Sequence, residues 1–237
     1  MPVDLQTKKL LYVPDPLKGA IGALHDLGPA YLRRRYTILF YTLLFTMVAS
    51  PILSAIGRRG ALIDALLAAN LLLAVMPLTS GISRRFLLAA MAAAWVARPL
   101  SAWLGHTTFS EMTLAAWTLI GLLAAAGALH FAMHGSRVDA EHLFAALSAY
   151  LLAGIYFGLL YWALEQLQPG TFVGANFSRT GATYFSFVTL ATLGYGDIVA
   201  RTDLGRSLAV LEAVGDQLFL AVLVARLLSL YSGAAKD

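Results

Sequence analysis

The chain has 237 residues, of which 59% are hydrophobic and only 13% carry a charge, with a formal net charge of +4. A soluble domain carries roughly 25% charged residues, so the composition indicates an integral membrane protein. Cysteine is absent, which excludes disulfides, thiolate metal sites and thiol catalysis. The basic residues lie mostly at the ends of apolar runs, a pattern that favours membrane topology over nucleic-acid binding.

The first segment, residues 1–35, is mixed in polarity and is predicted to be a cytoplasmic leader with a weakly amphipathic interfacial helix. Arg33, Arg34 and Arg35 stand directly before the first long apolar run. They can bind anionic lipid at the membrane surface, or they can simply hold the first span in its orientation. No compact apolar core typical of a cleavable signal is seen in this segment.

Six apolar runs approach the roughly 20 residues that a membrane helix needs. The predicted spans are Tyr36–Ile56, Ala61–Leu78, Phe86–Leu104, Met112–Phe131, Ala145–Leu167 and Leu204–Tyr231. Between the last two lies Thr180–Leu190, which is too short to cross and is followed by a glycine-rich loop. The sequence therefore predicts an all-α membrane protein with six spanning helices and one re-entrant helix.

The basic residues in the loops predict the orientation of the spans. Lysines and arginines before the first span, Arg84–Arg85 and Arg137 all fall on one side, and the loop 105–111 has none. Arg58–Arg59 disagree with this assignment. The balance predicts a multi-pass protein of the cell membrane with both termini in the cytoplasm.

The stretch Thr189–Asp197 (TLATLGYGD) carries two glycines, two threonines and an acid inside hydrophobic sequence. Backbone at membrane depth must be paired internally, buried in protein or exposed to a water-filled path. Alternating glycines let successive carbonyls turn towards one axis, while the Leu193 and Tyr195 side chains pack outwards. Stacked rings of such carbonyls, with the Thr192 hydroxyl, can replace the water shell of a cation.

Thr192–Asp197 (TLGYGD) resembles the signature of the six-span, tetrameric potassium channels, with leucine where valine is commonest. The resemblance implies that Thr192, Leu193, Gly194 and Tyr195 coordinate K⁺, and that Thr189, Gly196 and Asp197 support the filter and its outer mouth. It also implies a homotetramer with K⁺ as the permeant ion and no organic cofactor. Val188 occupies a position where some channels place a glutamate that partners the aspartate.

The same resemblance divides the chain into a four-helix, sensor-like domain at 36–134, a pore domain at 145–231 and a short cytoplasmic tail at 232–237. The fourth span, Met112–Phe131, contains neither lysine nor arginine. Voltage-dependent opening needs charge that moves through the field, about 2.3 kcal/mol per charge per 100 mV. We therefore expect a channel without conventional voltage gating, and no ligand-binding domain is predicted after Tyr231. Lipid, tension, pH and constitutive leak remain open as stimuli.

Two further pairs of polar residues lie among the first four spans. His130 and His134 share a helix face and could form a metal site or pH sensor, or be ordinary interfacial residues. Asp64 and Arg98 could pair as countercharges, or Arg98 could extend to the membrane surface.

The last span holds Glu212 and Asp216 on one helix face, with Gly215 between them as the candidate hinge. Intramembrane acids usually face protein or water. Asp216 could form an acidic ring in the cavity below the filter, or both acids could be tied to the pore helix or a neighbouring subunit. Gln217, Leu220 and Val224 are predicted to line the cavity.

Two alternatives to a selective potassium channel remain. One is a weakly selective cation channel. The other is an intramembrane aspartyl protease, because Gly194–Asp197 also fits the Gly-x-Gly-Asp motif, with Asp216 or Asp64 as the second acid. The polar loop after Asp197 and the two threonines, which have no role in that chemistry, argue against the protease.

Overall fold

The computed structural model describes residues 34–55, 61–75, 89, 92, 107–134, 139–174 and 177–234. The chain divides into two compact units, Met1–Arg35 and Tyr36–Asp237. The predicted leader therefore lies almost wholly outside the described residues, and the description below concerns the second unit. Side chains are described except at 54–55, 61, 107–112 and 229–234.

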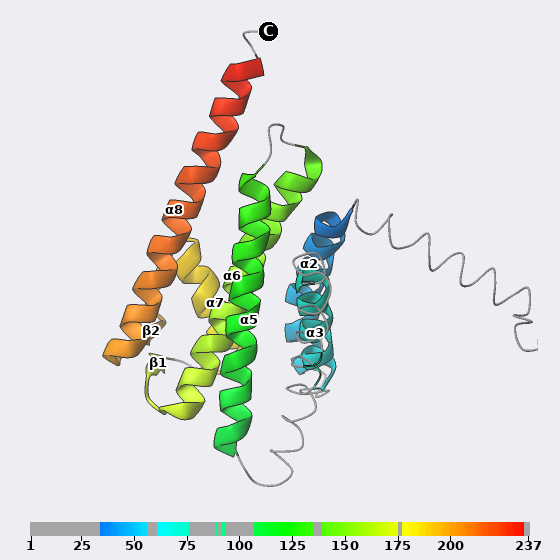
Figure 1. The fold of residues 1–237 in the computed structure, drawn as a ribbon. Helices are drawn as coiled ribbons and strands as arrows, with labels where there is room; N and C mark the ends of the chain where they lie inside the picture. The colour runs from blue at the N-terminus through cyan, green and yellow to red at the C-terminus, as the bar shows by residue number, and fades with distance from the viewer. Residues whose placement is uncertain are drawn as a thin grey trace, which may run out of the picture. The chain divides into compact units, whose positions relative to one another are not determined.

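The described part of the chain is dominated by helices (Figure 1). They are α2 (Arg35–Ala55), α3 (Ala61–Val75), α5 (Thr107–Met133), α6 (Ala140–Leu167), α7 (Arg179–Leu190) and α8 (Asp203–Ala234). Within the described residues, 4 helices are long and apolar enough to cross a membrane, namely α2, α5, α6 and α8, while Leu62–Val75 is a shorter apolar helix. The chain is thus a helical membrane protein. The predicted third span, Phe86–Leu104, lies outside the described residues apart from Ala89 and Ala92, so the number six stays a prediction.

Helix α6 is the centre of the packing and is buried along most of its length. Figure 1 shows it beside α5, and the two helices share the most extensive contact in the fold. Gly121 of α5 allows this approach, because a Cβ there would lie 2.3 Å from the ring of Tyr156. The Tyr156 hydroxyl donates to the Leu67 carbonyl of α3 at 3.3 Å. Small residues on α5 thus let α6 carry the large side chains that fill the core.

Polar contacts with α6 and α3 hold the N-terminal end and one side of α2. The first N–H groups of a helix have no partner within it, and here Glu141 of α6 accepts from the Tyr36 amide at 3.0 Å and from the Thr37 hydroxyl. Farther along, Asn70 of α3 donates to the Thr46 hydroxyl oxygen at 2.7 Å. Both interactions satisfy polar groups inside the helical core, where an unpaired group is costly.

A short antiparallel ribbon was not predicted from the sequence. Strand β1 (Phe172–Gly174) pairs with β2 (Ile198–Ala200), with Phe172 opposite Ala200 and Gly174 opposite Ile198. Gly174 has φ +145°, and a Cβ there would lie 2.1 Å from the Asp197 carbonyl oxygen. The ribbon therefore joins the segment before α7 to the segment that follows the glycine-rich loop.

Candidate functional site: the loop after α7 and its supports

Helix α7 begins within one residue of its predicted start. Ser178 is its N-cap and accepts from the Gly181 amide at 3.1 Å, as serine commonly does at this position. The helix has 12 residues, a length of roughly 18 Å at 1.5 Å per residue, well short of a bilayer core of roughly 30 Å. Helix α7 is therefore too short to span a membrane.

Two glycines of α6 let α7 lie directly against it. A Cβ at Gly158 would lie 2.5 Å from the Thr183 Cα atom, and one at Gly154 would lie 2.6 Å from the Phe187 ring. Ser186 of α7 adds a hydrogen bond at 2.8 Å between its hydroxyl and the Gly154 carbonyl. Because backbone meets backbone at Gly158, the position of α7 is closely defined by α6.

The loop after α7 has an alternating backbone. Thr192, Gly194 and Gly196 have φ values of +56°, +54° and +77°, and Thr192 is the only non-glycine residue with positive φ in the described chain. A non-glycine residue in this region is strained, and such strain is typical of functional sites. Positive φ values therefore recur at every second residue from Thr192 to Gly196.

The loop is anchored to the C-terminal end of α7 through its backbone. The Leu193 amide donates to the Val188 carbonyl at 2.9 Å, and the Thr192 amide donates to the Thr189 carbonyl at 3.0 Å. The Thr189 hydroxyl donates to the Phe185 carbonyl within the helix at 2.8 Å. These bonds satisfy the amides at the start of the loop and leave Leu193 and Tyr195 with 55% and 65% of their surfaces exposed.

Asp197 has a partner that sequence reasoning missed. The Tyr184 hydroxyl donates to its Oδ2 atom at 2.9 Å, and this bond to the carboxylate raises the pKa of Tyr184. The resemblance to potassium channels places a partner of the aspartate at Val188, and Tyr184 lies one helical turn earlier on the same face. A search of that face for hydroxyl donors could have found the pair.

Glu212 of α8 is buried between α6 and α7, with 2% of its surface exposed. Its carboxyl group accepts from the Tyr161 hydroxyl at 2.6 Å and contacts the Ser186 hydroxyl. Within the chain, Glu212 is therefore tied to α7, which agrees with one of the two alternatives left open by the sequence. The network joins α6, α7 and α8 at one point.

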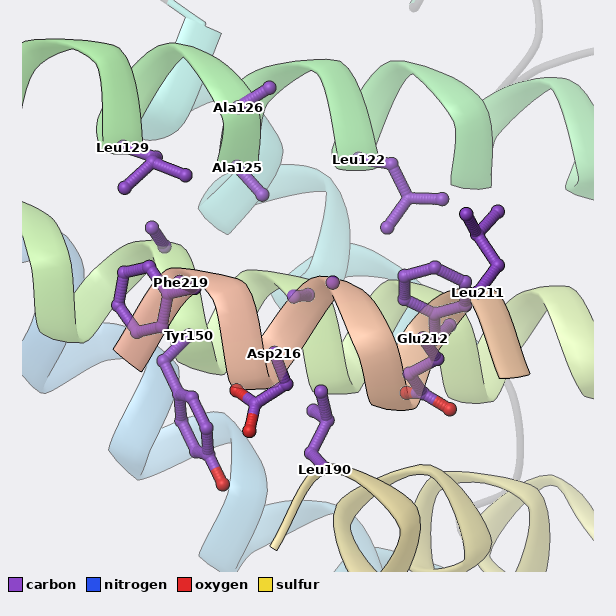
Figure 2. Close-up of a pocket in the computed structure, with 14 residues that line it drawn as sticks. Leu122, Ala125, Ala126, Leu129, Tyr150, Leu190, Leu211, Glu212, Asp216 and Phe219 are labelled. Carbon is purple, nitrogen blue, oxygen red and sulfur yellow. The ribbon is translucent and has the colours of Figure 1, made fainter. Parts of the chain in front are cut away.

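The other α8 candidates fall into two groups. Asp216 is 5% exposed and lies on the same side of α8 as Glu212 in Figure 2. Gln217, Leu220 and Val224 are exposed on the chain, as is Gly215, where an added Cβ would meet nothing within 4 Å. Gln217, Leu220 and Val224 lie on a mostly apolar face of α8 that no described part of the chain covers.

Asp64 has a partner in α7, since Arg179 donates to its Oδ1 atom at 2.7 Å. Arg98, the partner considered from the sequence, lies outside the described residues. The pair links α3 to the first residue of α7, over a separation of 115 positions. Arg179 is thus a support of the site that local sequence patterns did not reveal.

His130 and His134 stack with ring centroids 3.8 Å apart. His134 Nδ1 lies 2.8 Å from the His130 carbonyl oxygen, and His142 Nδ1 lies 2.6 Å from Asp139 Oδ1. No group of three or more His, Cys, Asp or Glu residues is placed to hold a metal ion among the residues described. The role of the two histidines as a sensor stays untested.

The comparisons with known proteins bear on this same region. Residues 146–232 match a family model described as "Ion channel". This stretch is similar to ion-channel domains. It contains α7, the alternating loop, the ribbon, most of α6 and nearly all of α8, so the match and the geometry concern the same residues. An ion-channel domain argues against the protease alternative.

One curated relative also matches. Over 77 residues the chain is 38% identical to the inward rectifier potassium channel Kirbac3.1 of Paramagnetospirillum magnetotacticum. The matched stretch covers 31% of this chain and 24% of that protein. The chain thus spans about a quarter of the length of the curated relative it matches. No solved structure gives a significant match.

Proposed function

We propose that this protein is a potassium-selective channel of the cell membrane, in which four copies each contribute Thr192, Leu193, Gly194 and Tyr195 to one filter. The observation that carries the proposal is the alternation of positive φ at Thr192, Gly194 and Gly196 directly after a helix too short to span. Similarity to a bacterial potassium channel favours K⁺ as the permeant ion. Conduction is passive, and the absence of Lys and Arg from Met112–Phe131 argues against conventional voltage gating.

A homotetramer follows from the chemistry of the filter. One chain supplies one loop, and a carbonyl ring that replaces the hydration shell of a cation needs several. Leu193 and Tyr195 are exposed in the single chain, and so are Val214, Leu218 and Val222 of α8. In a membrane protein such an apolar surface meets lipid or another copy of the chain, and the proposed filter requires the second.

A flux assay with matched glycine variants tests the proposal. Purified protein in liposomes is loaded with K⁺, and efflux is compared for the native chain, Gly196→Ala and Gly170→Ala. Both glycines have positive φ, +77° and +85°, and neither would place a Cβ within 4 Å of another atom. The backbone strain is therefore comparable, but only Gly196 lies in the loop that forms the proposed filter and its outer mouth. Loss of efflux in Gly196→Ala alone supports the proposal, whereas equal efflux in all three proteins contradicts it.

The predicted orientation, with both termini in the cytoplasm, has a direct test because the chain has no native cysteine. A cysteine introduced at Gly170 should react with a membrane-impermeant maleimide added outside the cell. A cysteine introduced at His134 should react only after the membrane is opened. The reverse pattern would invert the proposed topology.

The leader is proposed to bind anionic lipid through Arg33, Arg34 and Arg35. Each basic residue near an anionic surface contributes about 1 kcal/mol of binding. Replacing the three arginines by glutamine should remove any dependence of K⁺ efflux on anionic lipid. An unchanged dependence would place the lipid effect elsewhere in the protein.

A further inference from the structure

A cavity of about 340 Å³ lies between α5, α6 and α8, beside the end of α7. Figure 2 shows Leu122, Ala125 and Leu129 of α5 on one side of this cavity, with α8 and its acids on the other. Its lining is apolar except at Tyr150, Glu212 and Asp216. Glu212 is engaged with Tyr161 and Ser186, so Asp216 is the lining acid whose role is unexplained.

Asp216 is 95% buried, since 5% of its surface is exposed. Its Oδ2 atom is fully covered and no described residue gives it a hydrogen bond. A carboxyl oxygen that is removed from water without a donor is costly. A bound group that supplies the missing donor is one explanation for such an atom in a native protein.

Aromatic rings stand close to this acid. Tyr150 and Phe219 line the cavity and stack with centroids 6.4 Å apart, and Phe157 also contributes to the lining. Ring faces attract ammonium groups, most strongly where water is excluded. A carboxyl oxygen and aromatic rings in one apolar cavity form the chemical combination that recognises an ammonium group on an apolar body.

We propose that this cavity binds a small lipophilic amine, whose nitrogen donates to Asp216 and whose hydrocarbon body fills the apolar space between α5 and α8. An acyl chain would fill the space but leave Asp216 Oδ2 unpaired, and a hydrated cation would gain little from the apolar lining. The site is formed within one chain, so its occupancy does not depend on conduction through the filter.

The test measures binding of radiolabelled 1-aminoadamantane to the purified, assembled protein in lipid nanodiscs. We expect saturable binding of one molecule per chain that excess 1-adamantanol, a neutral molecule of the same shape, does not displace. Asp216→Asn should weaken binding by about tenfold or more, because hydrogen bonds to charged groups are among the stronger ones. Asp203→Asn makes the same change at an exposed acid of α8 outside the lining, so it is the matched control and should bind as the native protein does.

A second variant keeps the test decisive if Asp216→Asn fails to assemble. Ala126 lines the cavity and is exposed, so Ala126→Leu fills the space from α5 without entering the packed core. It should also weaken binding of the amine. The proposal is overturned if the native protein shows no saturable binding, if 1-adamantanol displaces the amine, or if assembled variants bind as the native protein does. It is also overturned if a side chain of a neighbouring copy fills the cavity in the assembled protein.

Discussion

The hydroxyl of Tyr184 lies 2.9 Å from the Asp197 carboxylate and joins α7 to the residue that follows the Gly-Tyr-Gly run. The two residues are 13 positions apart, so this bond closes the loop that follows α7. The ribbon adds a second restraint, because Ile198 pairs with Gly174. The outer end of the proposed filter is thus held both by a side chain and by backbone.

Removing the Tyr184 hydroxyl should loosen this end of the filter. The bond is exposed to solvent, so its loss should have a modest effect, and Tyr184→Phe should speed the loss of K⁺ flux in low-potassium solution by about twofold. Tyr41→Phe, at a tyrosine of α2 that is 59% exposed, is the matched control. Equal rates in both variants would mean that the bond does not support the filter.

The Glu212 network predicts different effects for two substitutions. In Glu212→Gln, the new carbonyl can accept from Tyr161 while the new amide donates to Ser186, whose hydroxyl then donates to Gly154. We therefore expect Glu212→Gln to assemble and conduct, with thermal stability close to that of the native protein. Glu212→Ala leaves the buried Tyr161 hydroxyl without this partner, while Ser186 keeps its bond to Gly154, and an unpaired buried hydroxyl costs about 1–3 kcal/mol.

Melting temperatures of the detergent-purified assembly, followed by size-exclusion fluorescence, measure both Glu212 variants. If the glutamine variant is as unstable as the alanine variant, an ionised carboxylate is needed at this position and the proposed exchange of donors is wrong.

The Arg179–Asp64 ion pair should couple α3 to the re-entrant helix. The two side chains are 22% and 24% exposed, so solvent screens the pair and we expect a coupling energy of about 1 kcal/mol. A double-mutant cycle with Arg179→Gln and Asp64→Asn measures this coupling from the melting temperatures. Additive effects of the two substitutions would show that the contact contributes no stability.

Asp139 caps α6 outside the membrane-spanning segment by accepting from the His142 amide. The hydrogen bond from the His142 side chain holds the pKa of Asp139 below its ordinary value of 3.8. Because folding lowers the pKa of Asp139, the ionised cap stabilises the folded state at pH values above the ordinary pKa of 3.8. This stability is lost as the pH falls through the lower, folded-state pKa.

Asp139→Ala should therefore lower the melting temperature at pH 7, because a lost N-cap costs about 1 kcal/mol. The difference from the native protein should still be present at pH 5 and should shrink only below about pH 3.8. A difference that disappears by pH 5 would contradict the assignment of Asp139 as an ionised cap.

The sequence predicted α7 and its loop closely, because the information there is local. The Ser178 cap, the apolar pattern up to Leu190 and the glycines that follow all lie within one short stretch. Helix α6 begins at Ala140, five residues before its prediction, because polar Asp139 caps a turn that lies outside the apolar run. The predicted spans Tyr36–Ile56 and Leu204–Tyr231 match α2 and α8 to within a few residues, because an apolar run is also a local signal.

The missed features depend on contacts between distant residues. The β1–β2 ribbon pairs two three-residue strands across α7 and the loop, and neither strand has a pattern long enough to be recognised alone. The Arg179–Asp64 pair and the Tyr161–Glu212 bond join residues 115 and 51 positions apart. The spacing of Glu212 and Asp216 places these two acids on one face of α8. Only the packing of α6 and α7 determines which protein groups meet that face.

The central claim is potassium selectivity, and a reversal potential measures it most directly. Purified protein is placed in a planar bilayer with K⁺ on one side and an equal concentration of Na⁺ on the other. The proposed filter predicts current that reverses only when the K⁺ side is strongly negative. Reversal near zero voltage would show equal permeability, contradict the selective filter and favour a weakly selective cation channel.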